Sequence, residues 1–178
     1  MFQSIGYGVT SDQHLNKFSG YYYGGTVSKS TIMIINDNSF VLDGLIAIMK
    51  KKGYRIVAAH NHEDGVSFLS TTVPDLILLD MTMEQSGGCE TLKFIIRNQV
   101  LSDVPVIMFS AQRGYSGDIC EFRERVSAVI EKPINTRVLM NAIDCALKDR
   151  KIAGGKDEVC VPALARNELD FDCHIPDK

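Results

Sequence analysis

Short apolar runs alternate with longer segments of helical periodicity through the middle of this chain. Five runs are rich in β-branched and aliphatic side chains, and they lie at residues 31–35, 54–59, 75–79, 104–109 and 127–131. Such near-continuous apolar runs are typical of strands that are buried on both faces of a sheet. Each run is followed by a segment with apolar residues at helical spacing, so the pattern predicts five strands alternating with five helices.

The helical segments differ in strength. The first has apolar residues at the spacing of an amphipathic helix, at Phe40, Leu42, Leu45, Ile46 and Met49. The fourth, near residues 119–125, is the weakest, and the last follows Pro133. Because parallel strands need crossover connections, this alternation predicts an α/β domain with a doubly wound, five-stranded parallel sheet and helices on both faces.

The α/β pattern spans residues 31–151. Residues 1–30 hold glycines and tyrosines without a sustained period and predict an irregular arm, either a flexible tail or a docking segment. Gly154 and Gly155 end the last helix, so we expect residues 152–178 to form a tail. A tail of that length is too short for an independent effector domain without a metal or a disulfide.

Composition and charge exclude several classes of function. A chain of 178 residues with 45% hydrophobic content suits one domain with a buried core. The net charge of -3 argues against direct nucleic-acid binding, and no stretch reaches the length of a membrane span. The N-terminus lacks the pattern of a secretion signal, so we expect a cytoplasmic protein whose five cysteines are reduced thiols.

Polar residues of several chemical types follow the predicted strands. Asn36 and Asp37 follow the first run, Asp80 the third, Ser110 the fourth and Lys132 the fifth. Ligands of open parallel sheets bind beyond the carboxyl ends of the strands, so these side chains should converge on one edge.

The converging residues have the chemistry to handle a phosphoryl group. Asp37 and Asp80 would give Mg²⁺ two carboxylate ligands, and one oxygen of Asp80 would stay free to attack phosphorus and form an acyl phosphate. Lys132 would place a positive charge on the phosphoryl oxygens, and the Ser110 hydroxyl would donate a hydrogen bond to them.

Four short motifs in this order resemble the receiver domain of two-component response regulators. The separations are 43 residues from Asp37 to Asp80, 30 from Asp80 to Ser110 and 22 from Ser110 to Lys132, and Gly88 matches the loop glycine of the family. The motifs are INDN (35–38), LLDMTM (78–83), FSA (109–111) and EKP (131–133). The resemblance covers about 120 of the 178 residues and implies the flavodoxin-like (βα)5 fold.

The resemblance also implies a role for each site residue. Asp80 becomes the phosphoacceptor, Asp37 a direct ligand of Mg²⁺ or Mn²⁺, and the Thr82 backbone carbonyl a third ligand. Ser110 becomes the switch hydroxyl and Lys132 the cation that binds the phosphoryl group. Such a domain would be a signalling protein and not an enzyme that turns over a substrate.

The same resemblance implies protein partners. The phosphoryl donor would be a histidine kinase or a histidine phosphotransfer protein. The output would be contact with a downstream protein, or formation of a homodimer, through the fourth helix, the fifth strand and the fifth helix. Neither a nucleic acid nor a membrane is expected as a direct partner.

Three residues depart from the family pattern. Asn36 replaces the first acid of the acidic pair, so we expect weaker metal binding and only an indirect contact with the metal through water. Val129 stands where many receivers have an aromatic switch residue, and Glu84 replaces a common proline. Asn36 and Val129 leave open a receiver-like module that binds partners without being phosphorylated. A phosphatase of the haloacid dehalogenase type is a distant alternative, because it requires a second aspartate where Thr82 stands.

Two further clusters invite a metal interpretation. His60 and His62, with the acids beside them, follow the second strand and lie away from the predicted site, so we expect a solvated loop. Cys160, Cys173 and His174 lack the paired spacing of a zinc site, and we expect free thiols.

Overall fold

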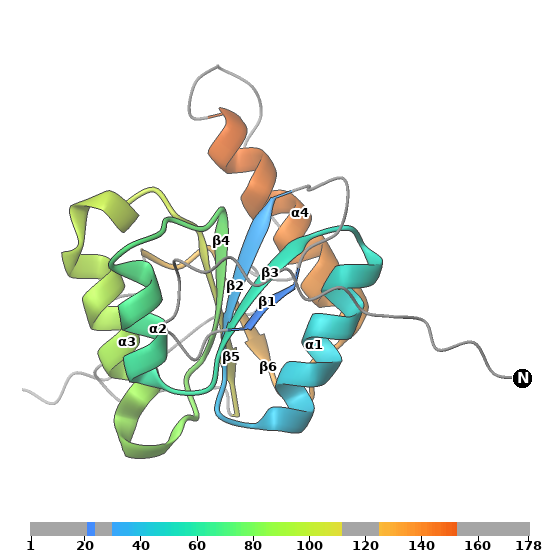
Figure 1. Ribbon diagram of the computed structural model, residues 1–178. Helices are drawn as coiled ribbons and strands as arrows, with labels where there is room; N and C mark the ends of the chain where they lie inside the picture. The colour runs from blue at the N-terminus through green and yellow to red at the C-terminus, as the bar shows by residue number, and fades with distance from the viewer. Residues whose placement is uncertain (1–20, 24–29, 112–124, 153–178) are drawn as a thin grey trace, which may run out of the picture.

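The computed structural model describes residues 21–23, 30–111 and 125–152 of the chain. These residues form one six-stranded sheet with helices on both faces (Figure 1). The strands are β1 (Tyr21–Tyr23), β2 (Thr31–Ile35), β3 (Arg55–Ala59), β4 (Leu76–Asp80), β5 (Val106–Ser110) and β6 (Ala128–Glu131). The helices are α1 (Ser39–Lys51), α2 (His62–Leu69), α3 (Gly87–Arg97) and α4 (Thr136–Ile152), with short 3₁₀ turns η1 (Glu84–Ser86) and η2 (Gln99–Leu101).

The prediction of five parallel strands is confirmed. The strand order is β1-β3-β2-β4-β5-β6, and the five strands from β2 to β6 are parallel to one another. Each predicted strand lies within two residues of the observed one. The apolar runs located the strands well because every residue of β4 and β5 is buried, and such strands have no polar face.

A sixth strand was not predicted. Tyr21–Tyr23 form β1 and pair antiparallel with β3, with Tyr22 opposite Val57. The prediction of an irregular arm over residues 1–30 is therefore wrong for these three residues. A strand of three residues on a sheet edge is held by main-chain hydrogen bonds, and it is too short to show a period in the sequence.

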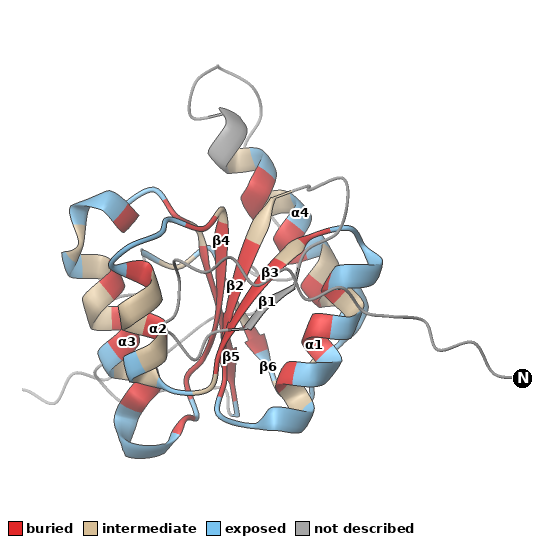
Figure 2. Cartoon of the chain, viewed as in Figure 1, coloured by how far each residue is buried: buried red, intermediate tan, exposed pale blue. Residues whose placement is uncertain are grey.

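Two apolar cores fill the space between the sheet and its helices. One core joins the sheet to α1 and α4, and the other joins it to α2 and α3, so the buried strands lie between two helical layers (Figures 1 and 2). Successive strand residues alternate between the cores: Ile34 and Leu78 belong to the first, and Ile35 and Leu79 to the second.

Helix α1 departs from its prediction at one position. Leu42, Leu45, Ile46 and Met49 are buried as expected, but Phe40 is 92% exposed. Phe40 stands two residues before Leu42, which at about 100° per residue places it on the opposite side of the helix. Its expected place in the apolar stripe is therefore wrong.

Two predicted elements fall largely or wholly outside the described residues. The fourth predicted helix lies mostly within residues 112–124, and the C-terminal tail lies beyond residue 152.

The prediction that all cysteines are reduced is contradicted at Cys145 of α4, which is disulfide-bonded, whereas Cys89 of α3 is free. None of the helices in the described part of the chain has both the length and the apolar character needed to cross a membrane.

Candidate functional site

The candidate site lies at the topological switch point of the sheet, between β2 and β4, where successive strands change from one side of β2 to the other. From β2 the chain passes to β3 on one side and then returns to β4 on the other, so the carboxyl ends of β2 and β4 are neighbours. Asn36 comes directly after β2, and Asp80 is the last residue of β4. Crevices at such reversal points are where open α/β sheets bind ligands.

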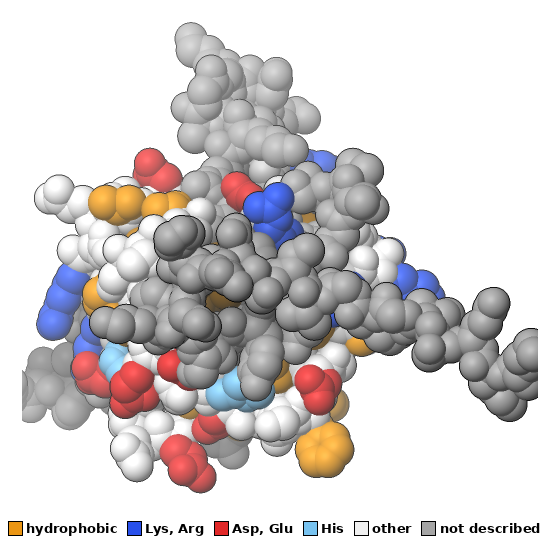
Figure 3. Space-filling model, in the orientation of Figure 1, with side chains coloured by type: hydrophobic (Ala, Val, Ile, Leu, Met, Phe, Trp, Pro, Cys, Tyr) orange, Lys and Arg blue, Asp and Glu red, His pale blue; other side chains and the backbone are white. Residues whose placement is uncertain are grey.

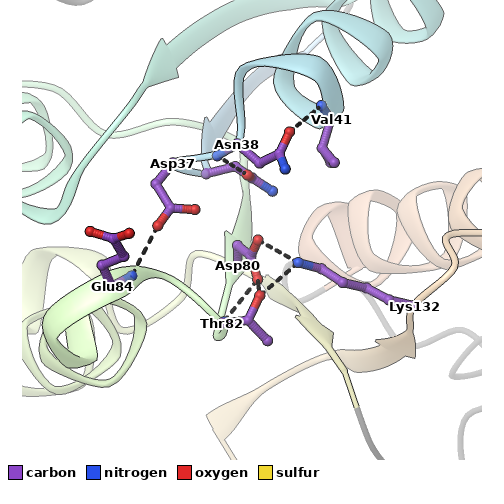
Figure 4. Close-up of polar contacts among 8 residues, drawn as sticks. Asp37, Asn38, Val41, Asp80, Thr82, Glu84 and Lys132 are labelled. Carbon is purple, nitrogen blue, oxygen red and sulfur yellow. Dashed lines mark hydrogen bonds and ion pairs between the residues drawn. The ribbon is translucent and has the colours of Figure 1, made fainter.

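Asp80 is a buried carboxylate with both oxygens engaged. It is 1% exposed. Its Oδ1 accepts hydrogen bonds from Thr82 N at 2.9 Å and from Thr82 Oγ1 at 2.7 Å, and its Oδ2 accepts one from Lys132 Nζ at 2.6 Å (Figure 4). Two neutral donors and one ammonium therefore compensate the cost of burying this charge.

Lys132 contacts both Asp80 and Thr82 through its ammonium group. Its Nζ donates to Thr82 Oγ1 at 2.7 Å as well as to Asp80, and its side chain is 26% exposed. The Lys132 backbone N–H donates to Ser110 O at 2.7 Å, which continues the pairing of β6 with β5 beyond the end of β6. The sheet thus positions the backbone from which the ammonium reaches Asp80.

Asp37 stands on the loop that follows β2 and is exposed. Its Oδ2 accepts a hydrogen bond from Glu84 N at 2.9 Å, and this bond ties the loop after β4 to the loop after β2 (Figure 4). Asn38 then caps α1, because its side chain accepts from Val41 N at 3.2 Å. The second predicted carboxylate is therefore on the same rim as Asp80.

Asn36 is fully buried beside this rim. Its Oδ1 accepts a hydrogen bond from Asn38 N at 2.8 Å, and its backbone N–H donates to Ala59 O at 3.1 Å. Its Nδ2 is a buried side-chain atom without a hydrogen-bond partner among the described residues. An unpaired buried donor is costly, so its presence at this site needs a reason.

Ser110 ends β5, the strand next to β4, and is 1% exposed. Phe109 lies opposite Asp80 in the register, so Ser110 is one residue beyond that pair. The sheet therefore brings Ser110 to the same edge as Asp80 and Lys132, as the sequence predicts.

Gly88 lies where α3 packs against the end of β4. A Cβ atom at this position would lie 2.5 Å from the Asp80 carbonyl oxygen and 2.7 Å from Met81 Cα. Only glycine allows the helix to approach the backbone of Asp80 this closely.

The donor set fits a hard divalent cation. Asp37 and Asp80 place two carboxylates on this rim, and Mg²⁺ commonly takes one or two carboxylates and keeps several waters. Within the described ranges, no group of three or more His, Cys, Asp or Glu side chains is arranged to hold a metal. With Asp37 and Asp80 as its side-chain ligands from the described residues, Mg²⁺ would keep water or phosphoryl oxygens among its other ligands.

The histidines after β3 are not among the hydrogen-bond partners described for Asp80, and His62 packs instead against the first turn of α3. His62 is not in a solvated loop, as the sequence suggested, but is the first residue of α2 and is partly buried. Its Nδ1 lies 2.9 Å from Thr91 Oγ1, and since Thr91 donates its own proton to Gly87 O, His62 is the donor. The cysteines and histidine of the proposed zinc alternative lie outside the described residues.

Acidic side chains are prominent along the lower rim of the face drawn in Figure 3, where α1 and α3 begin in Figure 1. Asp37 and Glu84 are exposed members of this part of the chain. Such a rim attracts cations and repels anions.

Comparison with known proteins gives the family. A family model described as the response regulator receiver domain matches residues 32–144. The chain belongs to the response regulator receiver family. The receiver is 24% identical over 116 residues to the PilH protein of Pseudomonas aeruginosa, a match that covers 65% of this chain and 96% of PilH. It is also 25% identical over 118 residues to the phosphate regulon transcriptional regulatory protein PhoB of the same organism.

The match to PhoB covers 66% of this chain but only 52% of PhoB, so the receiver spans about half of that relative. Among solved structures, it resembles a CheY-like receiver domain from Methanospirillum hungatei, with a TM-score of 0.62 and 23% identity over 70% of this chain and 98% of that one. It also resembles the N-terminal receiver domain of a protein from Methanoculleus marisnigri, with a TM-score of 0.54 and 31% identity over 65% and 94% of the two chains. The receiver is thus a signalling module of the two-component type.

Sequence reasoning missed three contacts of this site. The Thr82 side chain bonds both Asp80 and Lys132, whereas only its carbonyl was expected to contribute. The Asp-x-Thr spacing is a partial signal for the contact with Asp80, because an aspartate side chain often accepts a hydrogen bond from the backbone N–H two residues on, and this turn brings the Thr82 side chain close. The bond from Glu84 N to Asp37 joins separate loops and has no local signal.

Proposed function

We propose that this receiver accepts a phosphoryl group on Asp80 and thereby changes its protein-binding surface. The observation that supports this most is the buried Asp80 carboxylate, at the strand-order reversal, in contact with Lys132.

The chemical step is an in-line displacement at phosphorus. An oxygen of Asp80 forms a bond to phosphorus while the phosphorus–nitrogen bond of a phosphohistidine breaks, and the electron pair of that bond stays on the imidazole nitrogen. Lys132 moves its contact from Asp80 to a phosphoryl oxygen, and the Ser110 hydroxyl donates to another. A divalent cation held by Asp37, Asp80 and the Thr82 carbonyl would offset the repulsion between the carboxylates and the phosphoryl group.

The partners follow from this role. The donor would be a histidine kinase or a histidine phosphotransfer protein, and the receiver would act as a signalling module. The output surface would comprise β6, α4 and the fourth helix predicted near residues 119–125, which lies mostly outside the described residues, and there the receiver would contact a downstream protein or a second copy. Lys132 directly follows the last residue of β6, so this surface is continuous with the site.

The proposal includes a cytoplasmic location, and the disulfide at Cys145 is an observation against it. Disulfides are uncommon in reducing compartments. Alkylation of thiols in intact cells, followed by mass spectrometry of the Cys145 peptide, tests this point. Quantitative alkylation of Cys145 supports the cytoplasm, and protection that is lost only after reduction contradicts it.

Phosphoramidate labelling tests the chemistry. Incubation with Mg²⁺ and phosphoramidate should add the mass of one phosphoryl group, in a linkage stable to acid and labile to base. Asp80→Asn should abolish the gain. Asp103→Asn, a change at an exposed acid before β5, is the matched control and should leave it intact.

One alternative has an observation in its favour. Asn36 removes one carboxylate from the site, so a receiver that binds partners without phosphorylation is the second candidate. Absence of labelling at saturating Mg²⁺ would favour this module, and labelling that survives Asp80→Asn would refute the assigned phosphoacceptor. Steady release of phosphate from an unrelated monoester would instead indicate a phosphatase.

A further inference from the structure

The side-chain amide of Asn36 has a donor that its surroundings do not use. Asn36 is 0% exposed, and its Nδ2 is without a hydrogen-bond partner among the described residues. A flip of the side-chain amide, which exchanges Oδ1 and Nδ2, would not satisfy the unpaired donor. Its Oδ1 accepts from Asn38 N at 2.8 Å, and exchange of the two atoms would put a donor against that N–H.

The strand register places this amide beside Asp80. Ile35 lies opposite Leu79 on adjacent parallel strands, and the next residues along the two strands are Asn36 and Asp80. Ile34 and Leu78 both face the core of α1 and α4, so by alternation Asn36 and Asp80 both face that side. Adjacent strands lie about 4.8 Å apart, within the reach of these short side chains.

Asp80 itself is not the partner of this donor. Its two oxygens accept from Thr82 and Lys132, and Asn36 Nδ2 is not among their donors. A cation is no partner either, because an amide N–H donates and does not coordinate metal. The group that would satisfy Nδ2 is an oxygen acceptor close to Asp80, and an anionic oxygen would make the stronger bond.

The residue type matters because a carboxylate at this position could only accept hydrogen bonds. A carboxylate beside Asp80 would repel a phosphoryl group and make a cation between them necessary. An amide has no charge to be neutralised, and it can bond the phosphoryl oxygens directly. With an amide in place of the acid, less repulsion has to be offset by the metal, and the protein instead donates a hydrogen bond to the phosphoryl group.

We propose that Asn36 Nδ2 donates a hydrogen bond to an oxygen of the phosphoryl group on Asp80, and that phosphorylation of this receiver consequently depends less on a divalent cation than it would with aspartate at position 36. This inference rests on the proposed function, since it requires Asp80 to be the phosphoacceptor. It assigns Asn36 to the contact with the phosphoryl group itself, in place of an indirect contact with the metal through water.

The first test compares labelling by phosphoramidate with saturating Mg²⁺ and with EDTA. For each protein the ratio of the two rates measures the metal requirement. We expect the ratio of the rate with Mg²⁺ to the rate with EDTA to be about tenfold smaller for the wild type than for Asn36→Asp. In a Mn²⁺ titration followed by electron paramagnetic resonance, we expect Asn36→Asp to bind the ion about tenfold more tightly than the wild type. Asn98→Asp makes the same change of charge at the end of α3 and should leave the ratio at the wild-type value.

The second test uses the wild type alone, so it does not depend on the folding of a variant with a buried carboxylate. The ¹⁵N-labelled side-chain amide of Asn36 is followed by NMR while phosphoramidate modifies Asp80 in EDTA. We expect one of its two protons to move downfield as the new hydrogen bond forms.

The proposal requires both results. Equal rate ratios for the wild type and Asn36→Asp, or an unmoved amide proton in the phosphorylated protein, overturn the role of Asn36 while labelling of Asp80 still upholds the proposed function. Absence of labelling at Asp80 under every condition overturns both.

Discussion

Gly88 shows how one missing side chain sets the geometry of the site. A Cβ at this position would meet the Asp80 carbonyl oxygen at 2.5 Å, and backbone atoms cannot move aside as a flexible side chain would. We expect Gly88→Ala to lower the free energy of unfolding by about 1–3 kcal/mol, measured by urea denaturation. It should also slow labelling of Asp80, because α3 would be pushed away from the end of β4.

Gly44 provides the matched control for this change. It lies within α1, and a Cβ there would have no neighbour within 4 Å. Gly44→Ala should raise the free energy of unfolding by roughly 0.5–1 kcal/mol, because alanine loses less backbone entropy in a helix. A loss of stability in both variants would contradict the explanation based on close approach.

Tyr54 gives the stability of this receiver a dependence on alkaline pH. The Tyr54 hydroxyl donates to Asp144 Oδ1 at 3.2 Å, and burial, followed by the Asp144 charge and this hydrogen bond, raises the pKa of Tyr54 to about 12. The unfolded chain loses this proton near pH 10, so the folded state binds more protons between pH 10 and pH 12. Stability from this group is therefore complete below pH 10 and falls as the pH rises toward 12.

Tyr54→Phe should remove this part of the pH dependence. We expect the difference in urea midpoint between wild type and variant to shrink between pH 10 and pH 12, because only the wild type has the group that titrates. A difference that stays constant over this range would show that Tyr54 does not carry the effect.

At the scale of elements, β1 protects one edge of the sheet. It pairs with β3, and an unpaired β3 would present a row of free N–H and C=O groups. A variant that lacks residues 1–24 should therefore self-associate with increasing concentration in sedimentation experiments, and the amides of Ile56 and Ala58 should exchange faster with solvent. A variant that lacks only residues 1–20 keeps β1 and should behave like the full chain.

The elements that the sequence predicted best are those with the most complete burial. β4 and β5 are buried at every residue, so their apolar runs had few alternative explanations. β1 was missed because main-chain bonds to β3 hold it and its side chains follow no period. Phe40 was assigned to the buried face of α1 because it is apolar, although its angular position excludes it from that face.

At the scale of the whole molecule, topology explains why the site could be predicted at all. Residues 36, 80, 110 and 132 are far apart in the sequence, yet parallel strands bring their ends to one edge. The motif order therefore predicted which residues meet. It could not predict the rotamers, so the double role of the Thr82 hydroxyl and the unpaired Asn36 amide had to come from the structure.

The position of Lys132, directly after β6, links the Asp80 site to the register of this strand. Among the described strands, β6 has a single neighbour, β5, and it is held in place by Ser110 opposite Glu131 and by Lys132 N bonded to Ser110 O. Sliding this outer strand by one residue would displace Lys132 by about 3.3 Å, enough to break its 2.6 Å contact with Asp80. The Lys132–Asp80 ion pair therefore adds a side-chain contact to the β5–β6 backbone ladder in holding the register of this edge strand.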